Sequence, residues 1–224
     1  MKVNHLHNWN LSLPQAKALQ SKLASQIEIT RITTEIKLIA GIDCAFTDKG
    51  SKIIAVVVVL SFPDLKIIET TFAIEEVTMP YVPGLLSFRE APACIKAVEK
   101  LNITPDIFMV DGQGIAHPRR LGIASHLGLF FNKPTIGCAK SRLIGSFEYP
   151  SAEKGTFTPL FDKDQIIGSV LRTKKNIKPL FISVGHKCNL DDAIKITLQS
   201  TTKYRLPQPT RIAHETVTKL KTAH

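Results

Sequence analysis

The 224-residue sequence predicts a single α/β domain, in which helices flank a mixed β-sheet. Three apolar segments, 37–46, 53–62 and 65–74, follow one another too closely for crossover helices, so we expect an antiparallel meander. Beyond residue 85, helix-like and strand-like segments alternate, which is typical of parallel strands. No repeat, low-complexity tract or linker interrupts the chain, and we therefore expect one domain over residues 1–224.

The first half of the chain carries clear boundary signals. A helix is predicted over 14–26, with Pro14 near its start, where the missing N–H costs little. Pro63 and Asp64 mark the turn between the second and third strands. A loop over 77–84 is rich in proline and glycine. After it, the Ser-x-x-Glu spacing of Ser87 and Glu90 predicts a capping box that opens a helix ending near residue 100.

The second half continues with alternating elements. We expect a strand over 106–110, a helix over 119–131 and a short strand over 135–139. The later elements are two strands and two helices, at 166–171, 180–184, 190–202 and 210–221. This order is also found in ribonuclease H-like nucleases, an analogy of fold that assigns no function by itself.

Composition narrows the class of protein. Lys and Arg exceed Asp and Glu by ten, which is typical of proteins that bind polyanions, although a charge serving only solubility is an open alternative. The cysteines are far apart and form no Cys-x-x-Cys pair, which favours reduced thiols; they are Cys44, Cys94, Cys138 and Cys188. The N-terminal segment lacks the apolar core of a signal peptide, and the apolar run 53–60 is too short to cross a bilayer. We expect a cytoplasmic protein with no membrane partner.

The segment 107–122 is the most informative part of the sequence. An apolar strand delivers Asp111 to its carboxyl end, and a carboxylate in that place is a natural ligand for a hard cation. Gly112 and Gly114 leave space where another molecule must come close. Two arginines just beyond can bind phosphate through a planar set of donors. The combination points to phosphodiester chemistry.

Two further acids are candidates for the same site. Asp43 lies in an otherwise buried strand, where a carboxylate needs a cation or a donor, although alone it would equally fit a turn or a salt bridge. If the first and fourth strands are neighbours, Asp43 and Asp111 lie side by side, and a divalent cation would relieve their repulsion. Glu90 either caps its helix together with Ser87 or reaches the same sheet edge, because one carboxylate cannot fully do both.

Lys140 and two histidines have both functional and ordinary interpretations. Lys140 follows the strand 135–139, where its ammonium could neutralise charge on a phosphate, or simply be solvated. His117 could orient a ligand or hydrogen-bond the turn before Pro118. His214 lies on the last helix, and the sequence does not indicate which way it faces.

The loop over 80–84 presents one aromatic side chain between two prolines. Prolines on both sides restrict the backbone, so we expect Tyr81 to be held in place. A rigid ring near a nucleic-acid cleft can wedge between bases and fill the gap left by an extruded nucleotide. Packing of Tyr81 on the protein surface is the alternative.

Five segments together resemble the endonuclease V family of deoxyinosine-directed nucleases; they are 41–43, 80–90, 110–119, 137–141 and 204–210. The resemblance runs in order through nearly the whole chain. It implies a ribonuclease H-like fold and Mg²⁺-dependent hydrolysis beside a deaminated base, and Mn²⁺ is expected to substitute for Mg²⁺.

The resemblance also implies roles for individual residues. Asp43, Glu90 and Asp111 would bind the metal, and Lys140 and His214 would complete the catalytic set. The strand-separating wedge would comprise Pro80, Tyr81, Val82 and Pro83. The pocket for the extruded base would be lined by Leu86, Gly112, Gly114, His117 and Ile123.

By resemblance, the substrate is DNA that contains deaminated bases, and the protein acts as a monomer. Hydrolysis at the second phosphodiester 3′ to the lesion would leave a 3′-hydroxyl and a 5′-phosphate. Cleavage of inosine-containing RNA remains an alternative. A non-catalytic nucleic-acid-binding module is another, although a binder has no need of three converging acids. A zinc hydrolase is disfavoured, since the sequence has no His-rich or Cys-rich cluster.

Overall fold

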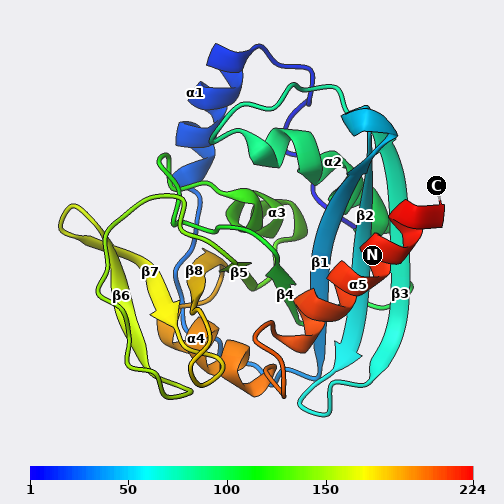
Figure 1. Cartoon of the computed structure of the whole chain (residues 1–224). Helices are drawn as coiled ribbons and strands as arrows, with labels where there is room; N and C mark the ends of the chain where they lie inside the picture. The colour runs from blue at the N-terminus through cyan, green and yellow to red at the C-terminus, as the bar shows by residue number, and fades with distance from the viewer. Residues whose placement is uncertain (224) are drawn as a thin grey trace.

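A computed structural model describes residues 1–223, which form one eight-stranded sheet with helices on both faces (Figure 1). The strands are β1 (Leu38–Thr47), β2 (Lys52–Ser61), β3 (Ile67–Glu76), β4 (Ile107–Val110), β5 (Thr135–Ala139), β6 (Phe157–Asp162), β7 (Gln165–Leu171) and β8 (Leu180–His186). The α-helices are α1 (Leu13–Ala24), α2 (Leu86–Glu99), α3 (Ile123–Phe131), α4 (Leu190–Gln199) and α5 (Gln208–Ala223). A 3₁₀ turn, Asp48–Gly50, joins β1 to β2.

The sheet is mixed, as predicted, with strand order β3-β2-β1-β4-β5-β8-β7-β6. The meander is confirmed, because β1 pairs antiparallel with β2, and β2 with β3. Strands β1, β4 and β5 are parallel, and Ile42 is the register partner of Val110. The expected neighbourhood of the first and fourth strands is therefore confirmed. Asp43 and Asp111 directly follow the register partners Ile42 and Val110, so they lie side by side, Asp43 within β1 and Asp111 just after β4.

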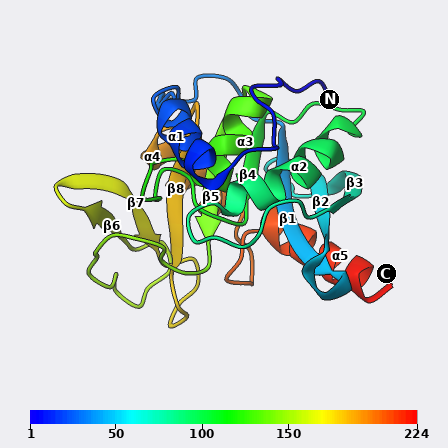
Figure 2. The ribbon, with the colours of Figure 1, turned by 90° about the horizontal axis from the view of Figure 1, so that it is seen from above.

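Two apolar layers fix the helices against the sheet. Strand β2 is buried on both faces, which explains its unbroken apolar run. Alternate residues of β1 and β2 pack against α2 and α3 on one face and against α5 on the other. Seen from above, α2 and α3 lie on one side of these strands and α5 on the opposite side (Figure 2). Helix α5 is thereby held against β1, the strand that carries Asp43.

The predicted capping box at Ser87 and Glu90 is wrong. Helix α2 begins at Leu86 without a side-chain cap, so Ser87 already lies inside the helix. The Ser87 hydroxyl instead hydrogen-bonds Nδ1 of His126 at 3.1 Å. Glu90 is thus free of the capping role. A capping box does form at α1, where Ser12 and Gln15 bond each other's backbone N–H groups.

Two other elements differ from the prediction. Helix α3 begins at Ile123 rather than near residue 119, because the chain turns at Arg120, whose φ is +57°. Strand β6 was not predicted. It is an edge strand that pairs with β7, and its Phe161 forms an isolated bridge with Ser146. It is largely exposed and contains Pro159, so neither periodicity nor propensity reveals it. Within residues 1–223, no helix is both long and apolar enough to cross a membrane. All four cysteines are free thiols.

Candidate active site

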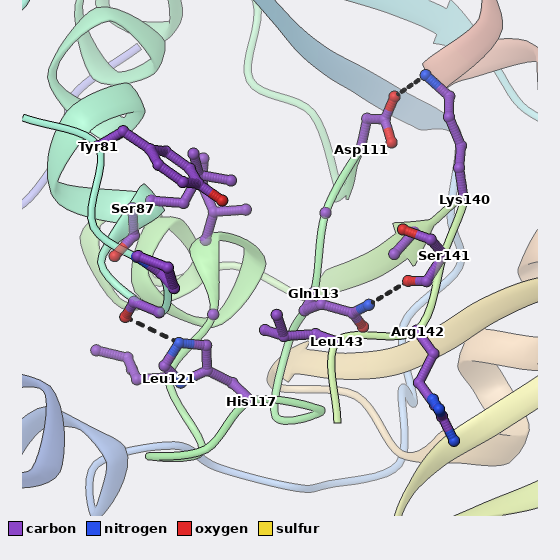
Figure 3. Close-up of a pocket in the computed structure, with 17 residues that line it drawn as sticks. Tyr81, Ser87, Asp111, Gln113, His117, Leu121, Lys140, Ser141, Arg142 and Leu143 are labelled. Carbon is purple, nitrogen blue, oxygen red and sulfur yellow. Dashed lines mark hydrogen bonds and ion pairs between the residues drawn. The ribbon is translucent and has the colours of Figure 1, made fainter. Parts of the chain in front are cut away.

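Two acids at the sheet edge form the chemical centre, and each has one cationic or imidazole partner. Asp43 Oδ2 accepts a hydrogen bond from Nδ1 of His214 at 2.7 Å. Lys140 Nζ lies 2.5 Å from Asp111 Oδ2 (Figure 3). The two carboxylates are about nine-tenths buried, whereas the Lys140 and His214 side chains are 36% and 48% exposed. We call these four residues the acid centre.

The acid centre has the geometry of a metal site. One ligand atom from each of Asp43, Asp111 and His214 lies within 4.8 Å of the others. Carboxylate oxygens are the ligands that hard divalent cations prefer, and an imidazole also binds several divalent transition metals. The structure also settles the direction of His214, which faces Asp43 from the first half of α5. These residues therefore fit a divalent cation.

Glu90 lies beside this group but outside its closest three ligands. Burial and the charges of Asp43 and Asp111 raise the Glu90 pKa to about 8. Burial and the Asp111 charge also raise the Asp43 pKa, against the lowering effect of the His214 hydrogen bond. Such crowding of carboxylates is relieved when a divalent cation binds among them. The raised Glu90 pKa therefore reflects the nearby charges of Asp43 and Asp111, and Glu90 has no capping role.

A cavity of about 350 Å³ opens next to the acid centre, and we call it the site cavity (Figure 3). Its walls come from the loop before α2, the start of α2, and the segments around Asp111, His117 and Lys140. Four predicted pocket residues line it: Leu86, Gly112, His117 and Ile123. Asp111 and Lys140 line it as well. The acid centre and the site cavity therefore share a wall.

His117 anchors the loop that forms the cavity mouth. Its Nδ1 accepts from the backbone N–H of Arg119, so Nε2 carries the proton and donates to the Gly84 carbonyl at 3.0 Å. Arg119 and Gln20 donate to the same oxygen at 2.7 and 3.0 Å. Burial lowers the His117 pKa to about 4, so the ring is neutral. His117 serves as a wall and an anchor of the loop.

The other residues of the predicted wedge and pocket are placed differently. Tyr81 lines the cavity and is 67% exposed, and Pro83 also lines it. Pro80 faces a separate groove shared with residues 9–13, and Val82 packs against the cluster around Phe88. Gly114 is not among the lining residues. Its Cα lies against β8, where an added Cβ would stand 2.0 Å from the Val184 carbonyl oxygen.

Several lining residues were not predicted. They are Gly84, Ser87, Gln113, Leu121, Gly122, Ala139, Ser141, Arg142 and Leu143. Gln113 Nε2 donates to the Ser141 carbonyl at 2.9 Å and so joins two loops far apart in the sequence. Ser141 ends the segment 137–141 that carries the family resemblance, whereas the only sequence signal for Arg142 and Leu143 was their position shortly after Lys140.

Comparison with known proteins assigns the family, since residues 21–215 match the family model described as Endonuclease V. The chain belongs to the endonuclease V family. A relative from Rippkaea orientalis is 50% identical over 95% of this chain and 93% of its own length. One from Kosmotoga olearia is 47% identical over 100% and 99% of the two chains. Both carry the name Endonuclease V, so membership implies a nuclease.

Solved endonuclease V structures share the fold. The protein from Streptomyces avermitilis is 38% identical, with a TM-score of 0.91 over 100% of this chain and 99% of that chain. The protein from Bacillus subtilis is 32% identical, with a TM-score of 0.95 over 100% of this chain and 98% of that chain. The Ciona intestinalis endonuclease V was solved with a 24mer DNA containing an inosine followed by a ribo-adenosine. It is 27% identical, with a TM-score of 0.82 over 95% of this chain and 99% of that chain.

Proposed function

We propose that this protein is a DNA repair endonuclease that recognises deaminated bases, chiefly deoxyinosine. In this proposal it hydrolyses the second phosphodiester bond 3′ to the lesion, with Mg²⁺ or Mn²⁺, and leaves a 3′-hydroxyl and a 5′-phosphate. The observation that carries the proposal is the wall shared by the acid centre and the site cavity, through Asp111 and Lys140. The inosine-containing DNA bound by the Ciona relative supports the choice of substrate.

The site cavity is suited to hold an extruded base. Leu86, Leu121 and Ile123 supply apolar walls, and the lack of a side chain at Gly112 lets Ile123 pack there, since an added Cβ would lie 2.5 Å from Ile123 Cγ2. Tyr81, exposed at the mouth, would fill the gap that the base leaves in the stack. The anchored Gly84 carbonyl keeps this loop fixed against the His117 segment while the base enters.

The acid centre is suited to phosphodiester hydrolysis. Asp43, Asp111 and Glu90 would hold the divalent cation, which supplies Lewis-acid stabilisation of charge on the phosphate. His214 orients the Asp43 carboxylate through its Nδ1–H. Lys140, whose ammonium is paired with Asp111, lies where it can move to a phosphate oxygen and neutralise developing charge. A bound cation would offset the charges of Asp43 and Asp111 that raise the Glu90 pKa, and would so favour the carboxylate form of Glu90.

The proposal is tested with a duplex that carries one inosine and a matched duplex that carries adenine. The wild type is expected to nick only the inosine strand, and only when Mg²⁺ or Mn²⁺ is present. Asp43→Ala and Asp111→Ala are expected to lose roughly 10²–10³-fold in rate, because cation stabilisation of the transition state is lost. Asp48→Asn, at an exposed acid that pairs with Lys52, is the matched control and should keep full rate. Retained nicking by either alanine variant contradicts the metal assignment.

Inosine-containing RNA is the second candidate substrate, favoured by the ribo-adenosine after the inosine in the Ciona complex. Competition between matched ribo- and deoxyribo-oligonucleotides decides between the two. Preferential cleavage of the deoxyribo strand supports the DNA assignment. Preferential cleavage of the ribo strand replaces it with an inosine-directed endoribonuclease.

A further inference from the structure

An exposed aromatic ring lies outside the site cavity and close in sequence to residues that contact the acid centre. Tyr204, in the loop before α5, is 41% exposed. The Arg211 guanidinium carbon lies 4.3 Å from the centre of its ring, and Lys203 Nζ lies 5.3 Å from it. None of these three residues lines the site cavity. The proposed recognition of the base and hydrolysis of the phosphodiester assign no role to this cluster of Tyr204, Arg211 and Lys203.

The cluster is tied to both sides of the acid centre. Arg205 Nη2 donates to the backbone carbonyls of Lys140, at 2.9 Å, and Pro179, at 2.8 Å. Lys140 is also the partner of Asp111. From the other side, Arg211 precedes His214 by three residues on α5, which places the two on one helix face. Tyr204 is therefore positioned beside the centre by contacts at two points.

The surroundings of the ring leave it able to accept a partner. Arg211 is held by Gln208 and Glu215 on its own helix, so it is a fixed support under one face of Tyr204. Lys203 is exposed and forms no ion pair within residues 1–223. An ammonium without an acidic partner, next to an exposed ring, is the pairing that binds a phosphate and a stacked base together.

Two groups of contacts relate these residues to each other. Asp111 and Lys140 belong to both the site cavity and the acid centre. Tyr204 does not line the cavity, and it adjoins the acid centre through Arg205, which bonds the Lys140 carbonyl, and Arg211, on the helix of His214. A strand with its lesion in the cavity and its cleaved phosphate at the acids would therefore leave the acid centre near Tyr204. Cleavage 3′ to the lesion sets the direction of that strand.

We propose that Tyr204 stacks on the base of the nucleotide that follows the cleaved bond, with Arg211 supporting the ring and Lys203 binding a phosphate. This site rests on the proposed function and extends it, because it would hold the part of the strand on the 3′ side of the cleaved bond. Its ligand class is a single-stranded nucleotide of any sequence, since every base offers a face for stacking.

The test is a double-mutant cycle that combines removal of the Tyr204 ring with removal of that base. Binding of inosine strands is measured in Ca²⁺, with a normal nucleotide or an abasic nucleotide directly after the target bond. Wild type is expected to bind the abasic strand about tenfold more weakly. Tyr204→Ala should bind both strands equally weakly, and Tyr204→Phe should behave as wild type because stacking needs only the ring. Tyr149→Ala removes a ring that is 73% exposed elsewhere and should also behave as wild type.

The outcomes separate this site from the proposed function. If base removal weakens binding equally in wild type and Tyr204→Ala, the stacking site is contradicted while inosine recognition stands. If the wild type binds strands with inosine and with adenine equally, the proposed function fails, and the stacking site, which is defined relative to the lesion, fails with it. Loss of binding in Tyr204→Phe also overturns the site, because it would assign the effect to the hydroxyl.

Discussion

At the residue scale, Lys140 links the two functions of the site. Its ammonium pairs with Asp111, and its side chain also lines the site cavity. A cation at the acid centre competes with this ammonium for the same carboxylate. Lys140 is therefore free to contact a phosphate only when the charge of Asp111 is satisfied in another way. We therefore expect Lys140 to couple occupation of the acid centre to binding of the strand.

Replacement of Lys140 is expected to separate metal affinity from catalysis. Lys140→Met leaves Asp111 without its ion pair, so Mn²⁺ should bind about tenfold more tightly in titration calorimetry. Nicking of an inosine duplex should nevertheless fall roughly 10²–10³-fold, because the phosphate charge loses its donor. Lys52→Met, which removes an exposed ion pair with Asp48, should change neither. Weaker Mn²⁺ binding in Lys140→Met would contradict the competition.

Tyr81 is expected to act on the lesion and not on the metal. Because the ring is exposed at the cavity mouth, Tyr81→Ala should weaken binding of an inosine duplex about tenfold and leave Mn²⁺ affinity unchanged. Tyr81→Phe should retain binding. Fluorescence anisotropy with inosine and adenine duplexes provides the measurement. If Tyr81→Ala discriminates between these duplexes as well as wild type does, Tyr81 has no wedge role.

At the element scale, close packing of α5 on β1 sets the direction of His214. A Cβ added to Gly41 would lie 2.1 Å from the Pro209 carbonyl carbon and oxygen, so the start of α5 rests directly on the strand. Two residues after Gly41, Asp43 meets His214. Only a glycine at position 41 allows this approach.

Gly41→Ala is therefore expected to displace α5 and disrupt the acid centre together. Overpacking of this kind costs about 1–3 kcal/mol of stability, which urea unfolding would show. Nicking should fall as well, since His214 moves away from Asp43. Gly155→Ala is a useful comparison, because a Cβ there meets nothing within 4 Å, although its positive φ carries some strain. It should lose some stability and keep the nicking rate; unchanged activity in Gly41→Ala would contradict the positioning role of the contact.

The same contacts show what the sequence could and could not predict. Strands β1, β2 and β4 were predictable because their apolar runs are long or lead directly to an acid. The direction of His214 was not, because it depends on how α5 rotates where it meets Gly41. The wall from Ser141 to Leu143 depends on a hydrogen bond from Gln113, which no local pattern encodes. Local signals thus predicted the acids, and tertiary contacts decided the shape around them.

At the scale of the whole molecule, two histidines, His117 and His126, are buried and neutral in the folded chain. Burial lowers the His126 pKa to about 3 and the His117 pKa to about 4. The unfolded chain would take up these protons below the ordinary value of 6.5, whereas the folded chain does not. Their contribution to stability is therefore present above pH 6.5 and is lost as the pH falls toward about 3.

The stability of the folded protein is expected to fall in acid because of these buried histidines. Each such histidine contributes up to ~1.4 kcal/mol of lost stability per pH unit below 6.5. His126→Gln is expected to be less stable at neutral pH, because it breaks the bonds to Ser87 and His7, but to show a shallower decline with acid. Urea midpoints for wild type and variant from neutral pH to about 4 provide the comparison. Parallel declines would show that His126 does not remain neutral in the folded protein.

In the proposed function, the wall shared by the site cavity and the acid centre sets the spacing between the bound base and the cleaved phosphate. The most direct test is to map the cut, at single-nucleotide resolution, in a duplex that carries one inosine and Mg²⁺. We predict one incision, at the second phosphodiester 3′ to the inosine, with the damaged nucleotide still in the strand and a 5′-phosphate on the downstream fragment. Incision at scattered positions, or equal incision of the matched adenine duplex, would contradict the account.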